Sequence, residues 1–107
     1  MYKHLVFWQL KPKAQGRTRL ENARLIVEKI KGLKSSIPEI QFLDVGLNVG
    51  AYKAAFSDVG MYITFLNEQD FLAYTKYESH DEVVAFIQSV MEEEIIVDFI
   101  NNTPTVR

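Results

Sequence analysis

The first segment of the chain, YKHLVFWQL at residues 2–10, carries bulky apolar side chains at both its even and its odd positions. The segment is short and rich in aromatic and β-branched residues, and Lys11-Pro12 ends it, which predicts a β-strand. Successive side chains of a strand point to opposite faces of a sheet, so the even-numbered residues share one face and the odd-numbered residues share the other. Both faces of this strand therefore need a covering layer.

A helix is expected at residues 18–35. Thr18 and Glu21 have the spacing of a capping box, in which each side chain satisfies a backbone N–H group at the open end of the helix. Pro38 ends the segment. Apolar residues recur within it at three- and four-residue spacing, the pattern of a half-buried helix: Leu20, Ala23, Ile26, Ile30, Leu33 and Ile37.

Three further strands are expected at residues 40–48, 59–66 and 94–100, with a loop at 48–58. Two helical pieces lie between the last two strands, one N-capped by Asn67 and one by Ser79, with Glu82 at the capping-box position of the second. The acidic run at residues 92–94 is interpreted as the solvated end of that helix.

The resulting order, βαββαβ with a broken second helix, predicts a ferredoxin-like α+β sandwich. In that fold the helices cover one face of a four-stranded antiparallel sheet and leave the other face bare. Leu5 and Phe7 would lie on the bare face. The simplest cover for them is a second copy of the chain, so we expect a homodimer that associates through the open sheet face.

Composition excludes several classes of function. The 107 residues fit one domain, residues 1–107, and the net charge of -2 gives no electrostatic basis for binding nucleic acid or an anionic membrane. The apolar run at residues 5–8 is too short for a signal peptide or a membrane span. Cysteine is absent, which removes disulfides and thiolate chemistry. We expect a cytoplasmic protein that needs no metal and no cofactor.

His80 is the first candidate for chemistry. If Ser79 is the N-cap, His80 is the first helical residue, where the positive end of the helix dipole disfavours an imidazolium. Apolar neighbours act in the same direction by desolvation. A neutral imidazole at pH 7 could accept a proton. The alternative is a core histidine with one hydrogen bond.

Three other residues could join His80 in a cavity between the sheet and the helices. His4 shares a strand face with Val6 and Trp8, and it is either a wall of that cavity or a structural residue. The Tyr74 hydroxyl could donate to a developing oxyanion, or could simply end a core side chain. Asp98 lies in an apolar strand and needs a partner, which is either a histidine N–H group or backbone N–H groups at the strand edge.

Four motifs, in this order, resemble the stress-responsive A/B barrel family, called Dabb: KHLVFWQLKP, SIPEI followed by LDVGLN, F-L-A-Y-x-x-Y-x-S-H, and IIVDF. The resemblance spans nearly the whole chain and implies a dimeric α+β barrel built from two face-to-face sheets. A plant branch of the family includes a cofactor-free polyketide cyclase with a pocket between helices and sheet. Its motif residues correspond to His4, Tyr74, His80 and Asp98.

We therefore expect an apolar cavity that binds a small carbonyl or aromatic compound. Its remaining walls would be Val6, Trp8, Ile26, Ile30, Met61, Ile63 and Val83. If the protein is an enzyme, we expect a cofactor-independent cyclase or lyase. His80, oriented by Asp98, would remove a proton next to a carbonyl group, and Tyr74 and His4 would stabilise the enolate. A further alternative is a haem-binding protein similar to the dimeric ferredoxin-like monooxygenases.

Overall fold

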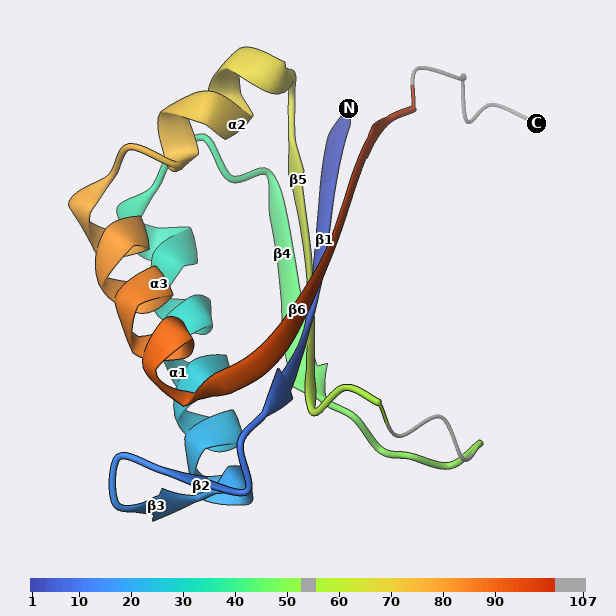
Figure 1. Cartoon of the computed structure of the whole chain (residues 1–107). Helices are drawn as coiled ribbons and strands as arrows, with labels where there is room; N and C mark the ends of the chain where they lie inside the picture. The colour runs from blue at the N-terminus through green and yellow to red at the C-terminus, as the bar shows by residue number, and fades with distance from the viewer. Residues whose placement is uncertain (53–55, 102–107) are drawn as a thin grey trace.

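A computed structural model describes residues 1–52 and 56–101 of the chain. Its main sheet is antiparallel, with four strands in the order β4-β5-β1-β6. Three helices lie together on one side of this sheet, and within the described residues the other side carries no helix (Figure 1). The predicted ferredoxin-like α+β fold is confirmed. Its elements are β1 at Tyr2–Leu10, α1 at Arg19–Ser36, β4 at Phe42–Leu47, β5 at Val59–Phe65, α2 at Glu68–Tyr74, α3 at Glu78–Val90 and β6 at Met91–Ile100.

β1 shows the alternation that its sequence predicts. The even-numbered side chains face the helices, and Val6, Trp8 and Leu10 are at most 4% exposed. They pack into one hydrophobic core with apolar residues from α1, β5 and α3. The odd-numbered side chains point to the open face, where Phe7 remains 36% exposed. One face of β1 therefore packs against the helices, and its other face forms part of the open sheet surface.

The start of α1 is determined by local sequence. The Thr18 hydroxyl accepts a hydrogen bond from the Glu21 backbone N–H group, and the Glu21 carboxylate accepts one from the Thr18 N–H group at 2.8 Å. The predicted capping box is confirmed. The predicted apolar stripe is buried except at its first position, because Leu20 is 50% exposed at the edge of the helix.

The start of α3 differs from the prediction. Asn67 does cap α2, but α3 begins at Glu78 with Tyr77 at the N-cap position and no side-chain cap. Ser79 is therefore inside the helix, where its hydroxyl oxygen lies 3.3 Å from that of Ser36 on α1. The predicted Ser79 cap is wrong, because packing against α1 places this turn of α3. His80 is consequently the third helical residue and not the first.

Two short elements were not predicted. A small hairpin of β2 at Lys13–Ala14 and β3 at Arg17–Thr18 precedes α1, with Gln15 and Gly16 in left-handed backbone conformations at its turn. The fully buried Asn22 side chain holds this hairpin, since its amide donates to the Ala14 carbonyl oxygen at 3.0 Å and its oxygen accepts from Arg17 at 2.9 Å.

β6 begins at Met91, three residues before the predicted strand at 94–100. The acidic run at 92–94 therefore belongs to a strand and not to a helix end, and that prediction was wrong. Glu94 lies directly opposite Trp8 of β1, and its carboxylate accepts a hydrogen bond from the indole N–H group at 2.8 Å. This bond gives the last of the three glutamates a partner across the sheet.

The open face of the sheet is apolar. In the register of β6 against β1, Ile95, Val97 and Phe99 lie opposite Phe7, Leu5 and Lys3, and these three β6 residues are 43–48% exposed. The loop predicted at 48–58 joins β4 to β5, and its residues 53–55 lie outside the described part of the chain. Within the described residues, no helix is long and apolar enough to span a membrane.

Candidate functional site

A histidine–aspartate pair joins β1 to the edge strand β6, on the side of the sheet that carries the helices. Antiparallel pairing of β1 with β6 places His4 directly opposite Asp98. The Nδ1 atom of His4 lies 2.5 Å from the Oδ1 atom of Asp98, within hydrogen-bonding distance. The His4 side chain is 10% exposed and the Asp98 side chain is 28% exposed. The predicted partner of Asp98, a histidine N–H group, is therefore present, and the histidine is His4.

Tyr2 completes this group, and the sequence argument did not single it out. Its hydroxyl donates to the Oδ2 atom of Asp98 at 3.0 Å. Burial, followed by the hydrogen bond to Asp98 and the charge of that carboxylate, raises the pKa of Tyr2 to about 12. One signal could have found it, because Tyr2 shares a β1 face with His4 at the even-numbered spacing.

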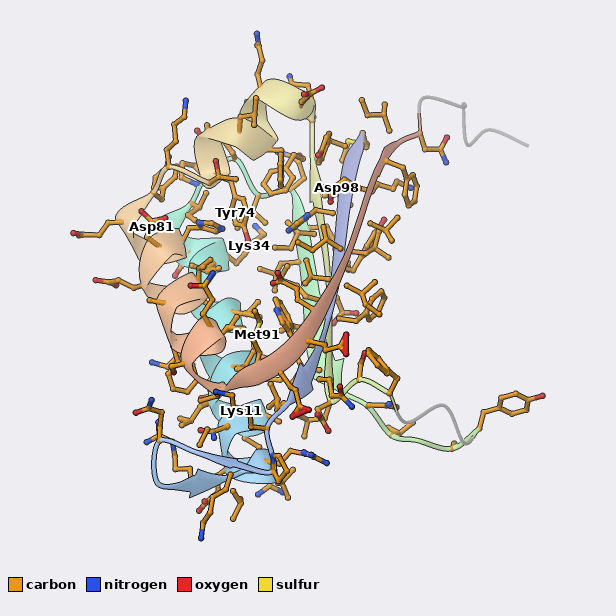
Figure 2. The ribbon with its side chains drawn as sticks, viewed as in Figure 1. Lys11, Lys34, Tyr74, Asp81, Met91 and Asp98 are labelled. Carbon is orange, nitrogen blue, oxygen red and sulfur yellow. The ribbon has the colours of Figure 1, made fainter. Side chains whose placement is uncertain are left out.

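Tyr74 lies between the two histidines. It is the last residue of α2 and is 3% exposed. Its ring centroid is 4.6 Å from that of His80, in an edge-to-face arrangement, and 6.2 Å from that of His4. Burial raises the pKa of Tyr74, and the negative charge of Asp98 adds to this effect. Tyr74 is therefore a neutral hydroxyl donor at physiological pH, and Figure 2 shows it in the layer between helices and sheet.

His80 has a different environment from His4. Its Nδ1 atom is buried and makes no hydrogen bond within the described part of the chain. The Asp81 carboxylate is 3.5 Å from this atom, without hydrogen-bonding geometry. Burial lowers the pKa of His80, Asp81 partly opposes this, and the nearby His4 adds to the lowering. The expectation that Asp98 orients His80 was wrong, since Asp98 is bound to His4 and Tyr2.

The predicted cavity walls are mostly core residues. Val83 is only partly buried and lines a shallow groove of about 230 Å³ between α1 and α3. The other six are at most 5% exposed and pack against one another: Val6, Trp8, Ile26, Ile30, Met61 and Ile63. These six side chains therefore fill the hydrophobic core instead of lining an open cavity.

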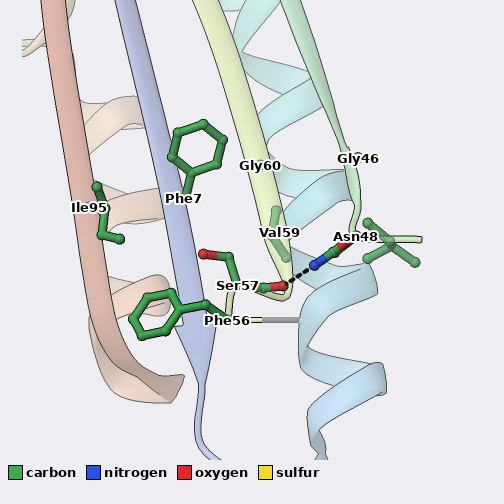
Figure 3. Close-up of a pocket in the computed structure, with 9 residues that line it drawn as sticks. Phe7, Gly46, Asn48, Phe56, Ser57, Val59, Gly60 and Ile95 are labelled. Atoms are coloured by element: carbon green, nitrogen blue, oxygen red, sulfur yellow. Dashed lines mark hydrogen bonds between the residues drawn. The ribbon is translucent and has the colours of Figure 1, made fainter. Parts of the chain in front are cut away.

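The open sheet face contains a larger hollow, of about 770 Å³ (Figure 3). Gly46 and Gly60, which are directly opposite each other in β4 and β5, form part of its floor, and Phe7, Phe56 and Ile95 form part of its rim. Sequence reasoning missed this hollow, because the pairing of the two glycines depends on strand register.

His4, Asp98 and Tyr74 together can bind and move a proton. The Asp98 carboxylate holds Nδ1 of His4, so Nε2 is the nitrogen left to accept a proton. Tyr74 supplies a hydroxyl donor in a buried setting, where such a donor stabilises an oxyanion most strongly. Among the described residues, no set of three or more histidine, aspartate or glutamate side chains is grouped to hold a metal ion.

Solved structures with the same fold include proteins of several kinds. A dimeric protein of unknown function from Bacteroides fragilis NCTC 9343 is 23% identical, with a TM-score of 0.80 over 92% of this chain and 93% of that chain. The hydroxynitrile lyase from Passiflora edulis is 20% identical, with a TM-score of 0.78 over 95% and 94% of the two chains. An antibiotic biosynthesis monooxygenase is 12% identical, with a TM-score of 0.70 over 97% and 100%.

Comparison with curated proteins found no significant match. The family comparison did: the model of the stress responsive A/B barrel domain matches residues 2–101, nearly the entire chain. The motifs at both ends of the sequence and the sheet with helices on one face agree with this match. The chain belongs to the stress responsive A/B barrel domain family, Dabb.

Proposed function

We propose that this Dabb protein binds a small carbonyl compound beside His4 and Tyr74 and catalyses cofactor-free proton transfer on it, as a lyase or cyclase. The observation that carries the proposal is the 2.5 Å contact between His4 and Asp98. A carboxylate that orients an imidazole in this way also stabilises the imidazolium that forms when the imidazole takes a proton. The hydroxynitrile lyase with the same fold supports the reaction class.

The reaction begins at Nε2 of His4, which removes a proton from the carbon next to the carbonyl group. The electron pair moves onto the carbonyl oxygen, and the Tyr74 hydroxyl donates a hydrogen bond to the enolate. In a condensation the enolate carbon attacks a second carbonyl group, and His4 returns its proton to the resulting alkoxide. No oxidant or reductant is consumed. His80, whose lowered pKa favours the neutral form, contributes an uncharged wall next to Tyr74.

The test is exchange of the α-proton in D₂O, followed by ¹H NMR over a panel of small β-keto and phenolic ketone compounds. Wild-type protein should accelerate exchange for at least one compound over buffer. His4→Gln should reduce that rate by about 10²-fold or more, the usual range for a general base. The proposal is wrong if no compound exchanges faster with the protein than without it, or if His4→Gln matches the wild type.

A binding protein without catalysis is the second candidate. It is favoured by the buried Nδ1 atom of His80, which has no hydrogen-bond partner among the described residues and could bond to a ligand. The same panel separates the two functions. Ligand-induced shifts of the histidine signals without α-proton exchange would indicate binding alone. The haem-binding alternative stays a prediction, and a Soret band on mixing with haemin would support it.

We further propose that a second copy of the chain covers the open sheet face, as expected from the sequence. The hollow at Gly46 and Gly60 supports this. Neither glycine has a left-handed backbone conformation. A Cβ atom on Gly46 would meet no described atom within 4 Å, so no contact within the described chain explains why this residue is a glycine. Glycine inside a strand often marks a close approach by another molecule. The similar Bacteroides fragilis protein is dimeric.

The dimer is tested with two matched substitutions, measured by light scattering after size-exclusion chromatography. Val97→Glu places a charge on the open face, and Leu72→Glu places one on α2; the two residues are 48% and 46% exposed. Val97→Glu should give monomers and Leu72→Glu should remain dimeric. Equal behaviour of the two variants would contradict the proposed interface. The single domain and the cytoplasmic location remain predictions.

A further inference from the structure

Both oxygens of the Asp98 carboxylate have a partner. Oδ1 contacts Nδ1 of His4 at 2.5 Å, and Oδ2 accepts the Tyr2 hydroxyl at 3.0 Å. A carboxylate with one partner can rotate about its last bond, and in a partly exposed position it can turn toward water and leave that partner. A carboxylate held at both oxygens cannot rotate without losing a hydrogen bond. The Tyr2 hydroxyl therefore restricts the orientation in which Asp98 meets His4.

Tyr2 is itself held in place by ring contacts. Its ring stacks on Phe71 of α2, with centroids 4.5 Å apart and planes 19° apart, and it meets the edge of Phe65 at 6.4 Å. Tyr2 lies opposite Ile100 in the register of β1 and β6, so its side chain reaches diagonally toward Asp98. With its pKa raised to about 12, the hydroxyl stays protonated and remains a donor over the physiological range.

Asp98 needs this second contact because β6 is an edge strand. Its side chain is 28% exposed, against 10% for His4. Its neighbours on the same face of β6, Ile96 and Ile100, are 52% and 53% exposed, so the helices do not cover this part of the strand. Water can compete for a carboxylate in such a position. Tyr2 occupies the oxygen that would otherwise turn toward solvent.

We infer that Tyr2 is a positioning residue, whose hydroxyl locks the Asp98 carboxylate and thereby fixes His4 in the tautomer that carries its proton on Nδ1. In that tautomer Nε2 has the free lone pair. As a statement about catalysis, this inference rests on the function proposed above. As a statement about the tautomer of His4, it stands on the geometry of the free protein, so it can be tested without a substrate.

The experiment is a long-range ¹H–¹⁵N correlation spectrum of the imidazole nitrogens at pH 8, recorded on uniformly labelled protein. The chain has two histidines, so a His80→Gln sample assigns the His4 signals. The variant is Tyr2→Phe, which keeps the ring that stacks on Phe71 and removes only the hydroxyl. The matched control is Tyr62→Phe, which removes a hydroxyl on the open face of β5.

Wild type and Tyr62→Phe should show His4 in one tautomer, with the proton on Nδ1. Tyr2→Phe should shift the nitrogen signals toward a mixture that includes the Nε2–H form, while the backbone amide spectrum keeps its fold. Once a substrate is known, kcat should fall in Tyr2→Phe with KM unchanged. An unchanged single tautomer in Tyr2→Phe would overturn the inference, and so would a wild-type His4 with its proton on Nε2.

The outcome is separable from that of the proposed function. A tautomer that depends on Tyr2, in a protein that exchanges no α-proton, would leave Tyr2 as a structural lock in a binding protein. Exchange that depends on His4 but not on Tyr2, with an unchanged tautomer, would keep the proposed function and remove Tyr2 from it.

Discussion

His4 and His80 are both histidines near Tyr74, but their surroundings differ. His4 is on a strand, and strand register brings a carboxylate to its Nδ1 atom. His80 is in the first turn of a helix that lacks a side-chain cap, and its Nδ1 atom is buried without a hydrogen bond. The difference teaches that a partner, and not burial alone, distinguishes the histidine that we propose as the base from the one that we propose as a neutral wall residue.

The contrast also reverses an expectation. Helix position and apolar neighbours made His80 the leading base, and burial does lower its pKa. The carboxylate that was expected to orient it is 2.5 Å from His4 instead. The Asp81 carboxylate lies 3.5 Å from Nδ1 of His80 without hydrogen-bonding geometry, whereas the Asp98 carboxylate lies 2.5 Å from Nδ1 of His4. The closer carboxylate is the reason why we propose His4 as the base.

Removing the partner of His4 should have the largest effect. Asp98→Asn keeps the size of the side chain but replaces a carboxylate with an amide that can bind either tautomer. Where α-proton exchange is measurable, its rate should fall by about 10²-fold or more. Asp44→Asn is the control, because it removes a charge on the open face of the sheet, opposite to the face that carries His4. Near-wild-type exchange in Asp98→Asn would mean that the Asp98 carboxylate does not distinguish His4 from His80 as a base.

The pH dependence of stability should identify His80. Its pKa is lower in the folded than in the unfolded chain, so the unfolded chain binds more protons as the pH falls through this window. The stabilisation is complete above about pH 6.5, the unperturbed histidine value, and is lost as the pH falls toward the folded pKa. Urea unfolding at pH 7.5 and pH 5 should show a smaller loss in His80→Gln than in wild type.

Asp81→Asn gives the matched comparison for that titration. Asp81 raises the pKa of His80 against the effect of burial, so its removal should lower that pKa further and increase the acid loss of stability. The acid sensitivity would not come from His80 if His80→Gln and wild type lost the same free energy of unfolding between the two pH values.

The smallest effects concern the two helix starts. Thr18→Ala removes a capping hydrogen bond of α1 and should lower the free energy of unfolding by about 1 kcal/mol. Ser79→Ala, near His80, removes a hydroxyl that caps nothing and should change it by less than about 0.5 kcal/mol. Denaturant titrations measure both. A Ser79→Ala variant as unstable as Thr18→Ala would show that the start of α3 is capped in solution.

These elements show which parts of the structure were predictable from sequence. β1 and α1 were, because alternation and a capping box are local patterns of Tyr2–Leu10 and of Thr18 with Glu21. The start of α3 was not, because its contact with α1 comes from residues more than 40 positions apart, Ser36 and Ser79. The same holds for the β2–β3 hairpin, which a buried Asn22 side chain stabilises after the chain has folded back.

The site was predictable as a set of residues but not as a set of pairs. The alternation of side chains along β1 predicted that His4 faces the helices. The apolar neighbours of Asp98 predicted that its carboxylate has a hydrogen-bond partner. Which histidine serves Asp98 depends on the register of β1 against β6, and no local pattern gives that register. Tyr2 was missed for the same reason, since its contact with Asp98 spans 96 positions.

The decisive measurement compares α-proton exchange in His4→Gln and His80→Gln, on the first compound that the wild-type protein accelerates. The expected result is an exchange rate near that of buffer in His4→Gln and a largely retained rate in His80→Gln. The reason is that Asp98 lies within hydrogen-bonding distance of Nδ1 of His4, whereas Asp81 lies 3.5 Å from Nδ1 of His80 without hydrogen-bonding geometry. The opposite order, with exchange lost in His80→Gln and kept in His4→Gln, would contradict the assignment of His4 as the base.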